Sequence, residues 1–201
     1  MKNNSNILDI DKYYPKTKDN LFFDANIWLY LYYPLGNYNQ RIIAKYAALL
    51  KRSLESTATI VLSSLVVSEF FNRYLRLEFE LLKKKEPDKY QDFRKNFKSS
   101  AEWEKCIKSI TSIFEKHIFK IAKRIDDKFD SLNRKDLLNN IENFDFNDKY
   151  YLQISDEEKF KIVTDDAGFA IGSNKVPIIT ANYSNMLKKV MELKKVMEMK
   201  Q

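Results

Sequence analysis

Cysteine, histidine and glycine are scarce in this sequence of 201 residues. The single cysteine, Cys106, excludes an intramolecular disulfide and a cysteine-rich zinc site. The three glycines, Gly36, Gly168 and Gly172, form no glycine-rich phosphate loop, which argues against a nucleoside-triphosphate site. The one histidine, His117, lies beside an apolar stripe, so we expect a packed or surface histidine rather than the base of a Ser-His-Asp hydrolase.

Long apolar runs and linkers are also missing from the sequence. No run approaches the roughly 20 apolar residues that cross a bilayer, and no basic segment followed by a long apolar segment opens the chain. We therefore expect a cytoplasmic protein without membrane contact. Since no stretch rich in proline, glycine and serine divides the chain, we expect a single domain over residues 1–201.

Charged residues, in contrast, are abundant. They make up 31% of the chain, and 35 Lys and Arg against 28 Asp and Glu give a net charge of +7. The basic residues are scattered through every segment, which favours a polyanionic partner such as nucleic acid. Many lysine-rich proteins bind no nucleic acid, so the charge alone does not decide. Hydrophobic residues make up 44%, enough for a packed core.

The hydrophobic pattern alternates between strands and helices. Short apolar runs predict four buried strands, at residues 21–23, 59–62, 162–164 and 176–179. Apolar residues at helical spacing predict helices at 27–33, 41–54, 64–86, 99–125 and 148–158. Residues 1–20 read as an extended lead-in, and Ser99 with Glu102 fits a capping box. The pattern predicts an α/β fold of three layers around a central parallel sheet, with a helical insertion at about 77–142 and a C-terminal helix at about 185–201.

Carboxylates follow two of the predicted strands. Asp24 comes directly after residues 21–23, and Asp165 and Asp166 come after residues 162–164. Ligands of open parallel sheets bind beyond the carboxyl ends of the strands, so this edge is a candidate metal site. Alternation along a strand places Thr164 and Asp166 on one side, which favours Asp166 as the metal-side carboxylate and leaves Asp165 as a cap or a supporting acid. Asn26 could cap a helix or add an amide oxygen.

Two further acids lie near the starts of predicted helices that adjoin this edge of the sheet. Glu69 lies one turn into its helix at the border of the apolar face, and Asp148 opens another helix on the side of Tyr151. Each acid by itself also fits an ordinary role as a cap, a surface pair or a helix-start charge. Together, converging carboxylates repel unless a divalent ion neutralises them, and oxygen ligands of this kind select Mg²⁺ or Mn²⁺. Such an ion suits hydrolysis of a phosphodiester in nucleic acid.

The segments that carry these acids resemble a known family. They read FFDANIWL, SSLVVSEFF, DFNDKYYLQIS, KIVTDDAGF and VPIITAN in this order, and together they resemble a PIN-domain nuclease. The resemblance covers most of the chain except residues 77–142, and it implies a metal-dependent endoribonuclease with Mg²⁺ or Mn²⁺. Residue by residue, it assigns the four acidic ligands and catalytic residues to Asp24, Glu69, Asp148 and Asp166. Thr164 matches the hydroxyl of the T-x-D pattern, and Asn26 matches the amide beside the first aspartate.

The resemblance also implies partners and leaves alternatives. RNA would be the substrate, and members that are toxins of toxin-antitoxin pairs are inhibited by an antitoxin protein and commonly form homodimers. The long insertion at 77–142 departs from the compact toxin pattern. A catalytically silent RNA-binding scaffold of the same fold is the main alternative, and a two-metal nuclease of the RNase H kind is another. Aromatic clusters such as Trp28 with Tyr30 are expected in the core rather than as base-stacking platforms.

Overall fold

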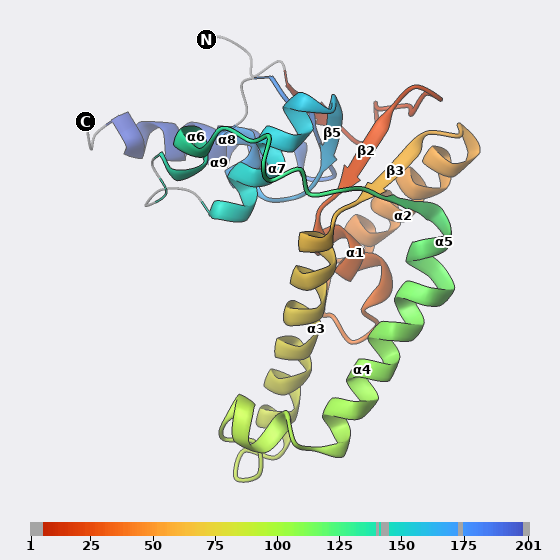
Figure 1. The fold of residues 1–201 in the computed structure, drawn as a ribbon, viewed down its shortest axis with the longest axis vertical. Helices are drawn as coiled ribbons and strands as arrows, with labels where there is room; N and C mark the ends of the chain where they lie inside the picture. Colours follow the sequence, from red (N-terminus) through yellow and green to blue (C-terminus); the bar gives the residue numbers. More distant parts are fainter. Residues whose placement is uncertain (1–5, 140, 142–144, 173–174, 199–201) are drawn as a thin grey trace.

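The protein folds around one parallel sheet from which a long helical arm projects (Figure 1). The computed structural model describes residues 6–139, 141, 145–172 and 175–198. The described part of the chain holds a sheet of six strands in the order β1-β6-β5-β2-β3-β4, all parallel. The strands are β1 (Ile7–Asp9), β2 (Asn20–Phe23), β3 (Thr59–Leu62), β4 (Ala122–Arg124), β5 (Phe160–Val163) and β6 (Ile178–Thr180).

Helices cover both faces of this sheet. Those of the body are α1 (Ala25–Tyr32), α2 (Gln40–Glu55), α6 (Arg134–Leu138), α7 (Phe146–Glu157), α8 (Ala167–Gly172) and α9 (Tyr183–Glu198). Successive residues of a strand point to opposite faces. On β2, Phe22 meets Tyr151 of α7 with ring centroids 4.8 Å apart, whereas Phe23 meets Trp28 of α1 at 5.3 Å. The sheet therefore lies between two helical layers, and the predicted three-layer α/β fold is confirmed.

The arm is built from two antiparallel helical segments that leave the carboxyl edge of the sheet (Figure 1). Its elements are α3 (Ser64–Lys85), the π-helical turn η1 (Phe93–Phe97), α4 (Ala101–Ile113), the π-helical turn η2 (Phe114–Ile118) and α5 (Phe119–Ile121). Ser63 caps α3 by accepting a hydrogen bond from the backbone of Val66 at 3.4 Å. Lys83, Lys84 and Lys85 stand in the last turn of α3, where the helix dipole favours positive charge.

Some expected boundaries are wrong. The helix expected at 99–125 begins at Ala101 and ends at Ile121, because Ala122–Arg124 pair with β3 as the edge strand β4. That strand lies inside the expected insertion, so the insertion at 77–142 is not helical throughout. The extended lead-in contains the edge strand β1, and the helix α8 was not expected.

Some of the predicted ranges extend past what the structure describes. Residues 140 and 142 of the insertion and residues 199–201 of the C-terminal helix lie outside the described residues. Over the part that is described, none of the helices is long and apolar enough to span a membrane.

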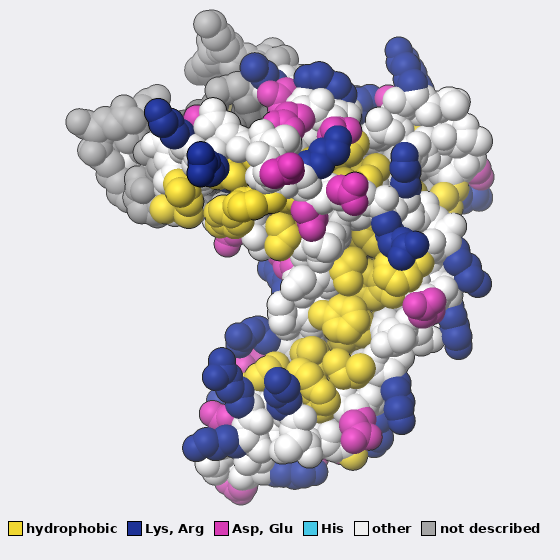
Figure 2. All heavy atoms as spheres, in the orientation of Figure 1, with side chains coloured by type: hydrophobic (Ala, Val, Ile, Leu, Met, Phe, Trp, Pro, Cys, Tyr) yellow, Lys and Arg dark blue, Asp and Glu magenta, His cyan; other side chains and the backbone are white. Residues whose placement is uncertain are grey.

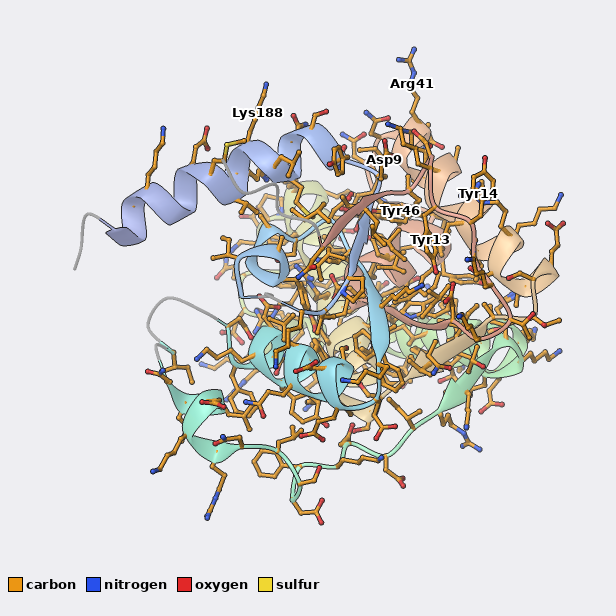
Figure 3. The ribbon with its side chains drawn as sticks, turned by 90° about the horizontal axis from the view of Figure 1, so that it is seen from above. Asp9, Tyr13, Tyr14, Arg41, Tyr46 and Lys188 are labelled. Carbon is orange, nitrogen blue, oxygen red and sulfur yellow. The ribbon has the colours of Figure 1, made fainter. Side chains whose placement is uncertain are left out.

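Side chains on the helices of the body divide between the core and solvent. Figure 3 shows Tyr46 directed from α2 toward the sheet, whereas Arg41 and Lys188 point away from the body. Tyr46 is fully buried, and Arg41 and Lys188 are exposed. His117 is exposed on the arm, where its ring stacks on Tyr32 at a centroid distance of 5.5 Å. This surface stacking agrees with the structural role expected for the histidine.

Candidate functional site

The chain changes direction in the sheet between β2 and β5, which are neighbours. After β2 the chain moves to β3 on one side, and after β5 it moves to β6 on the other. The helix after β2 is α1, on the face of Phe23, whereas the helix after β5 is α8, whose Phe169 stacks on Tyr151 on the opposite face at 6.2 Å. Ligand sites of open α/β sheets form in the crevice between two such diverging helices. Both predicted strand-end acids come from this point.

Asp24 is the most deeply buried acid of the crevice. Its side chain is 3% exposed, and its backbone N–H donates to the carbonyl of Val163 at 3.1 Å, which joins the ends of β2 and β5. Asp24 stands at the N-cap position of α1, yet its carboxylate makes no capping hydrogen bond to the described helix. Instead, Oδ2 accepts from the hydroxyl of Thr164 at 2.9 Å and from Nδ2 of Asn26 at 3.3 Å. Burial first, and then the nearby Glu69 carboxylate, raises the pKa of Asp24 to about 7.

Asp166 belongs to the same crevice as Asp24. Its backbone N–H donates to Oγ1 of Thr164 at 2.9 Å, so the hydroxyl that holds Asp24 also holds the Asp166 backbone. The Asp166 carboxylate accepts a hydrogen bond from the backbone N–H of Gly168 at 2.8 Å. The negative charge of Asp166 contributes to the raised pKa of both Asp24 and Asp148, as expected for a carboxylate in the same crevice.

Asp165 is directed elsewhere, although it precedes Asp166 in the chain. Its carboxylate accepts hydrogen bonds from the hydroxyls of Tyr46 and Thr180, the latter at 2.8 Å, and from Nδ2 of Asn182 at 3.0 Å. These partners come from α2, from the end of β6 and from the turn between β6 and α9. Asp165 therefore ties the layers of the body together, and the geometry agrees with the expectation that Asp166, rather than Asp165, stands on the side of the other acids.

Asp148 reaches the crevice from the first turn of α7. A β-carbon placed on Gly168 would lie 2.7 Å from Oδ2 of Asp148 and 3.2 Å from Oδ1 of Asp166, so the two carboxylates meet over this glycine. Burial, followed by the charges of Asp166 and Asp24, raises the pKa of Asp148 to about 8. A carboxyl with such a pKa is held largely protonated at neutral pH unless a cation lies beside it.

Glu69 reaches the crevice from the second turn of α3. Oε1 pairs with Nη1 of Arg73 one turn further along the helix at 3.2 Å, and Oε2 accepts from the hydroxyl of Tyr151 at 3.4 Å. Burial raises the pKa of Glu69; Arg73 opposes this shift, and the charges of Asp145 and Asp166 add to it. Glu69 is therefore partly balanced by a direct ion pair with Arg73.

Asp145 is an acid of this region that the sequence reasoning missed. It caps α7 by accepting from the backbone of Asn147 at 2.8 Å, and its charge raises the pKa of Asp148 and of Glu69. The segment DFND carries both Asp145 and Asp148. Asp148 follows Asp145 at position i+3, about one helical turn later. That spacing is the signal that could have found Asp145.

The acidic site, as we name Asp24, Glu69, Asp148 and Asp166, thus comes from four different parts of the fold. The charges of its members contribute to the raised pKa of Asp24, Glu69 and Asp148. Among the residues that the structure describes, no group of three or more His, Cys, Asp or Glu side chains is arranged to hold a metal ion directly. Mg²⁺ keeps several waters and takes one or two carboxylates, so the donors of the acidic site fit such an ion. The raised pKa values come from burial first and then from the neighbouring carboxylates, and a cation beside the acids would lower them.

No family model matches the sequence, and no functionally characterised protein matches it.

Proposed function

We propose that this protein is a divalent-metal-dependent nuclease that hydrolyses phosphodiester bonds of RNA, as the resemblance to PIN domains implies. The observation that carries the proposal is the acidic site itself. Four carboxylates come from strand ends and helix starts around the point where the chain changes direction in the sheet. Burial and the neighbouring carboxylates raise the pKa of Asp24 to about 7 and the pKa of Asp148 to about 8. Such a cluster favours a cation over solvent, and the excess of basic residues elsewhere favours a polyanionic substrate.

The residues of the site take distinct roles in this proposal. Asp24, Asp148 and Asp166 would hold the ion, directly or through its waters, and Glu69 would orient a water molecule while Arg73 neutralises part of its charge. A bound Mg²⁺ or Mn²⁺ supplies Lewis-acid stabilisation of a phosphate oxygen and a more acidic water. Thr164 and Asn26 orient Asp24 by donating to its Oδ2, and Asp165 keeps the strand end that carries Asp166 in place.

A silent RNA-binding scaffold is the second candidate function. The observation that favours it is the lack, in the described ranges, of three side chains that close around an ion as they stand. In a scaffold the acids would be structural and binding of RNA would not depend on metal. A cytoplasmic location, an antitoxin and a homodimer stay predictions.

The test is cleavage of a mixed RNA pool with Mn²⁺ by the wild type and by four variants, Asp24→Asn, Glu69→Gln, Asp148→Asn and Asp166→Asn. Altering residues that merely support metal ligands lowers activity by about 10- to 100-fold, so we expect each of these changes to cost on the order of 100-fold or more. Asp130→Asn, an exposed aspartate outside the acidic site, is the matched control and should cleave as the wild type does.

The same samples separate the two candidates. Cleavage that EDTA stops and that the four variants lose supports the nuclease. A wild-type protein that binds RNA equally with Mn²⁺ and with EDTA, and cleaves none, would establish the scaffold instead. Equal cleavage by the wild type and all four variants would show that the acidic site is not where the reaction occurs.

A further inference from the structure

The positive charge of the protein is concentrated on the arm. Residues 73–121, about a quarter of the chain and all described, contain 13 Lys and Arg against 8 Asp and Glu. This segment therefore carries +5 of the net charge of +7. Each of the 13 basic side chains is exposed, and Figure 2 shows Lys and Arg along the edges of the arm down to its tip. The basic field that the composition predicts thus has a definite location.

Several acids of the arm are engaged in its own structure. Asp92 accepts hydrogen bonds from the backbones of Arg94 and Lys95 at 2.9 and 2.7 Å, and so caps η1. Glu86 pairs with Lys89 at 3.4 Å. The net charge of +5 already includes both carboxylates, so the arm stays positive with these contacts in place.

One helix face connects this charge to the acidic site. Arg73, Arg76 and Lys83 follow Glu69 on α3 at intervals of four, three and seven residues, which places all four on the same side of the helix. Glu80 interrupts the stripe. At about 1.5 Å per residue the stripe is about 20 Å long. It begins beside the carboxylates and ends near the tip of the arm.

Aromatic rings accompany the basic side chains toward the tip. Arg76 lies over the ring of Phe93 at 5.4 Å, Lys83 over Phe79 at 5.8 Å, and Lys98 over Trp103 at 5.8 Å. Phe93 and Trp103 are half-buried, and Figure 2 shows hydrophobic side chains running along the arm between its basic edges. A positive surface interleaved with partly exposed rings is the combination that binds single-stranded nucleic acid.

We propose that the arm binds single-stranded RNA along α3 and leads it to the acidic site. The phosphates would follow the stripe of Arg73, Arg76 and Lys83 and continue over Lys84 and Lys85, which share the last turn of α3 with Lys83. Unpaired bases would contact the rings near the tip. The inference rests on the proposed function insofar as RNA is the substrate of the acidic site. It assigns substrate binding to the arm and leaves the reaction to the carboxylates.

The test is binding of a fluorescent single-stranded RNA to the full-length protein in EDTA, where metal-dependent cleavage is stopped. The arm variant Lys83→Gln, Lys84→Gln, Lys85→Gln removes three exposed charges. Each phosphate contact on a single strand contributes about 0.7 to the slope of log affinity against log salt, so the slope should fall by about 2 and the affinity at about 0.1 M salt by on the order of 100-fold.

The matched control removes the same number of charges from the segment between β1 and β2, with Lys12→Gln, Lys16→Gln and Lys18→Gln, all exposed. It should bind as the wild type does. Arg76→Gln is a second arm variant and should weaken binding by a smaller amount. Equal losses in the arm variant and the control, or wild-type binding by both arm variants, would overturn the proposal.

Binding and cleavage report on different parts of the molecule. Loss of binding in the arm variants would support the arm even if the wild type never cleaves RNA, in which case the proposed function alone is wrong. Cleavage that depends on the four acids, together with unchanged RNA binding by the arm variants, would support the proposed function. It would also show that the arm does not bind the RNA.

Discussion

Thr164 connects the two strand ends of the acidic site through one hydroxyl. It donates to Oδ2 of Asp24 at 2.9 Å and accepts from the backbone N–H of Asp166 at 2.9 Å, and its own side chain is fully buried. A threonine hydroxyl can donate one hydrogen bond and accept another at the same time. A valine side chain has a similar shape but can do neither. The T-x-D pattern therefore has a physical reason: the threonine fixes the carboxylate of one strand relative to the backbone of the next.

The burial of Asp24 predicts an unusual dependence of stability on pH. Its pKa of about 7 lies above the ordinary value of 3.8 for an aspartate, so the folded state binds more protons than the unfolded state between these values. The free energy of unfolding of the metal-free protein should therefore fall as pH rises from about 4 to above 7. Three pKa units correspond to about 4 kcal/mol at most. Urea unfolding in EDTA at pH 5 and pH 8.5 measures the change.

The variant Asp24→Asn serves as the control because its amide stays neutral throughout this range. The wild type should lose more stability than the variant between the two pH values, and Mn²⁺ at pH 8.5 should restore it in the wild type. If the stability difference between the two proteins is the same at both pH values, Asp24 is ionised at little cost and the raised pKa is wrong.

Gly168 keeps room for the two carboxylates that meet above it. In Gly168→Ala the new β-carbon would lie 2.7 Å from Oδ2 of Asp148, a distance that forces this flexible carboxylate aside. Because alanine favours the helix α8 by about 1 kcal/mol over glycine, the fold should survive. We expect Mn²⁺-dependent cleavage to fall by about 10- to 100-fold, as for other residues that support metal ligands, with little change in the melting temperature. Cleavage kinetics beside a thermal melt test this, and a large drop in melting temperature would contradict it.

At the scale of elements, the sequence was most informative where apolar runs were buried on both faces. The expected strand 59–62 coincides with β3, and the strands at 21–23 and 162–164 differ from β2 and β5 by two residues or fewer at each end. The strands that were missed, β1 and β4, have three residues each and lie at the edges of the sheet. The local pattern predicts a helix at Ala122–Arg124, but these residues form a strand because they pair with β3. No local pattern encodes this pairing.

The start of α4 shows the limit of local capping signals. Ser99 and Glu102 fit a capping box in sequence, but the cap is Ser100, whose hydroxyl accepts from the backbone of Trp103 at 3.2 Å. The hydroxyl of Ser99 instead donates to the carbonyl of Lys95 in η1. Two adjacent serines offer the same chemistry, and the turn that precedes them decides which one caps the helix.

The acidic site was predictable in its residues but not in its geometry. Strand ends and helix starts place Asp24, Glu69, Asp148 and Asp166 near one edge from sequence alone. Alternation along the strand predicted that Asp165 is directed away from the other acids, but it could not predict the partners of Asp165. Tyr46, Thr180 and Asn182 lie more than ten residues away along the chain and reach Asp165 only through packing of the layers. Tertiary contacts of this kind cannot be predicted from the local sequence pattern.

Across the whole molecule, α3 belongs to the body and to the arm at once. Its first half buries Val66 and Phe70 in the core of the sheet, and its second half buries Phe79 against the tip, where the rings of Phe93 and Phe97 lie 5.3 and 5.8 Å away. The buried residues form one continuous hydrophobic cluster from the sheet to the tip. An arm joined in this way should unfold together with the body, as expected for a single domain.

Phe97→Ala tests this cooperativity, because Phe97 is fully buried at the tip and contacts Trp103 at 5.5 Å. Removal of a buried phenylalanine costs about 3–5 kcal/mol. In a single cooperative unit the whole protein loses this stability, so helical circular dichroism and near-ultraviolet aromatic signals should show one coincident transition at a lower temperature. Phe129→Ala, an aromatic that is 57% exposed outside the arm, is the control and should leave the transition unchanged. Two transitions in Phe97→Ala, with the upper one at the wild-type temperature, would instead show that the arm unfolds independently of the body. The basic stripe would then lie on a separately folded part of the protein.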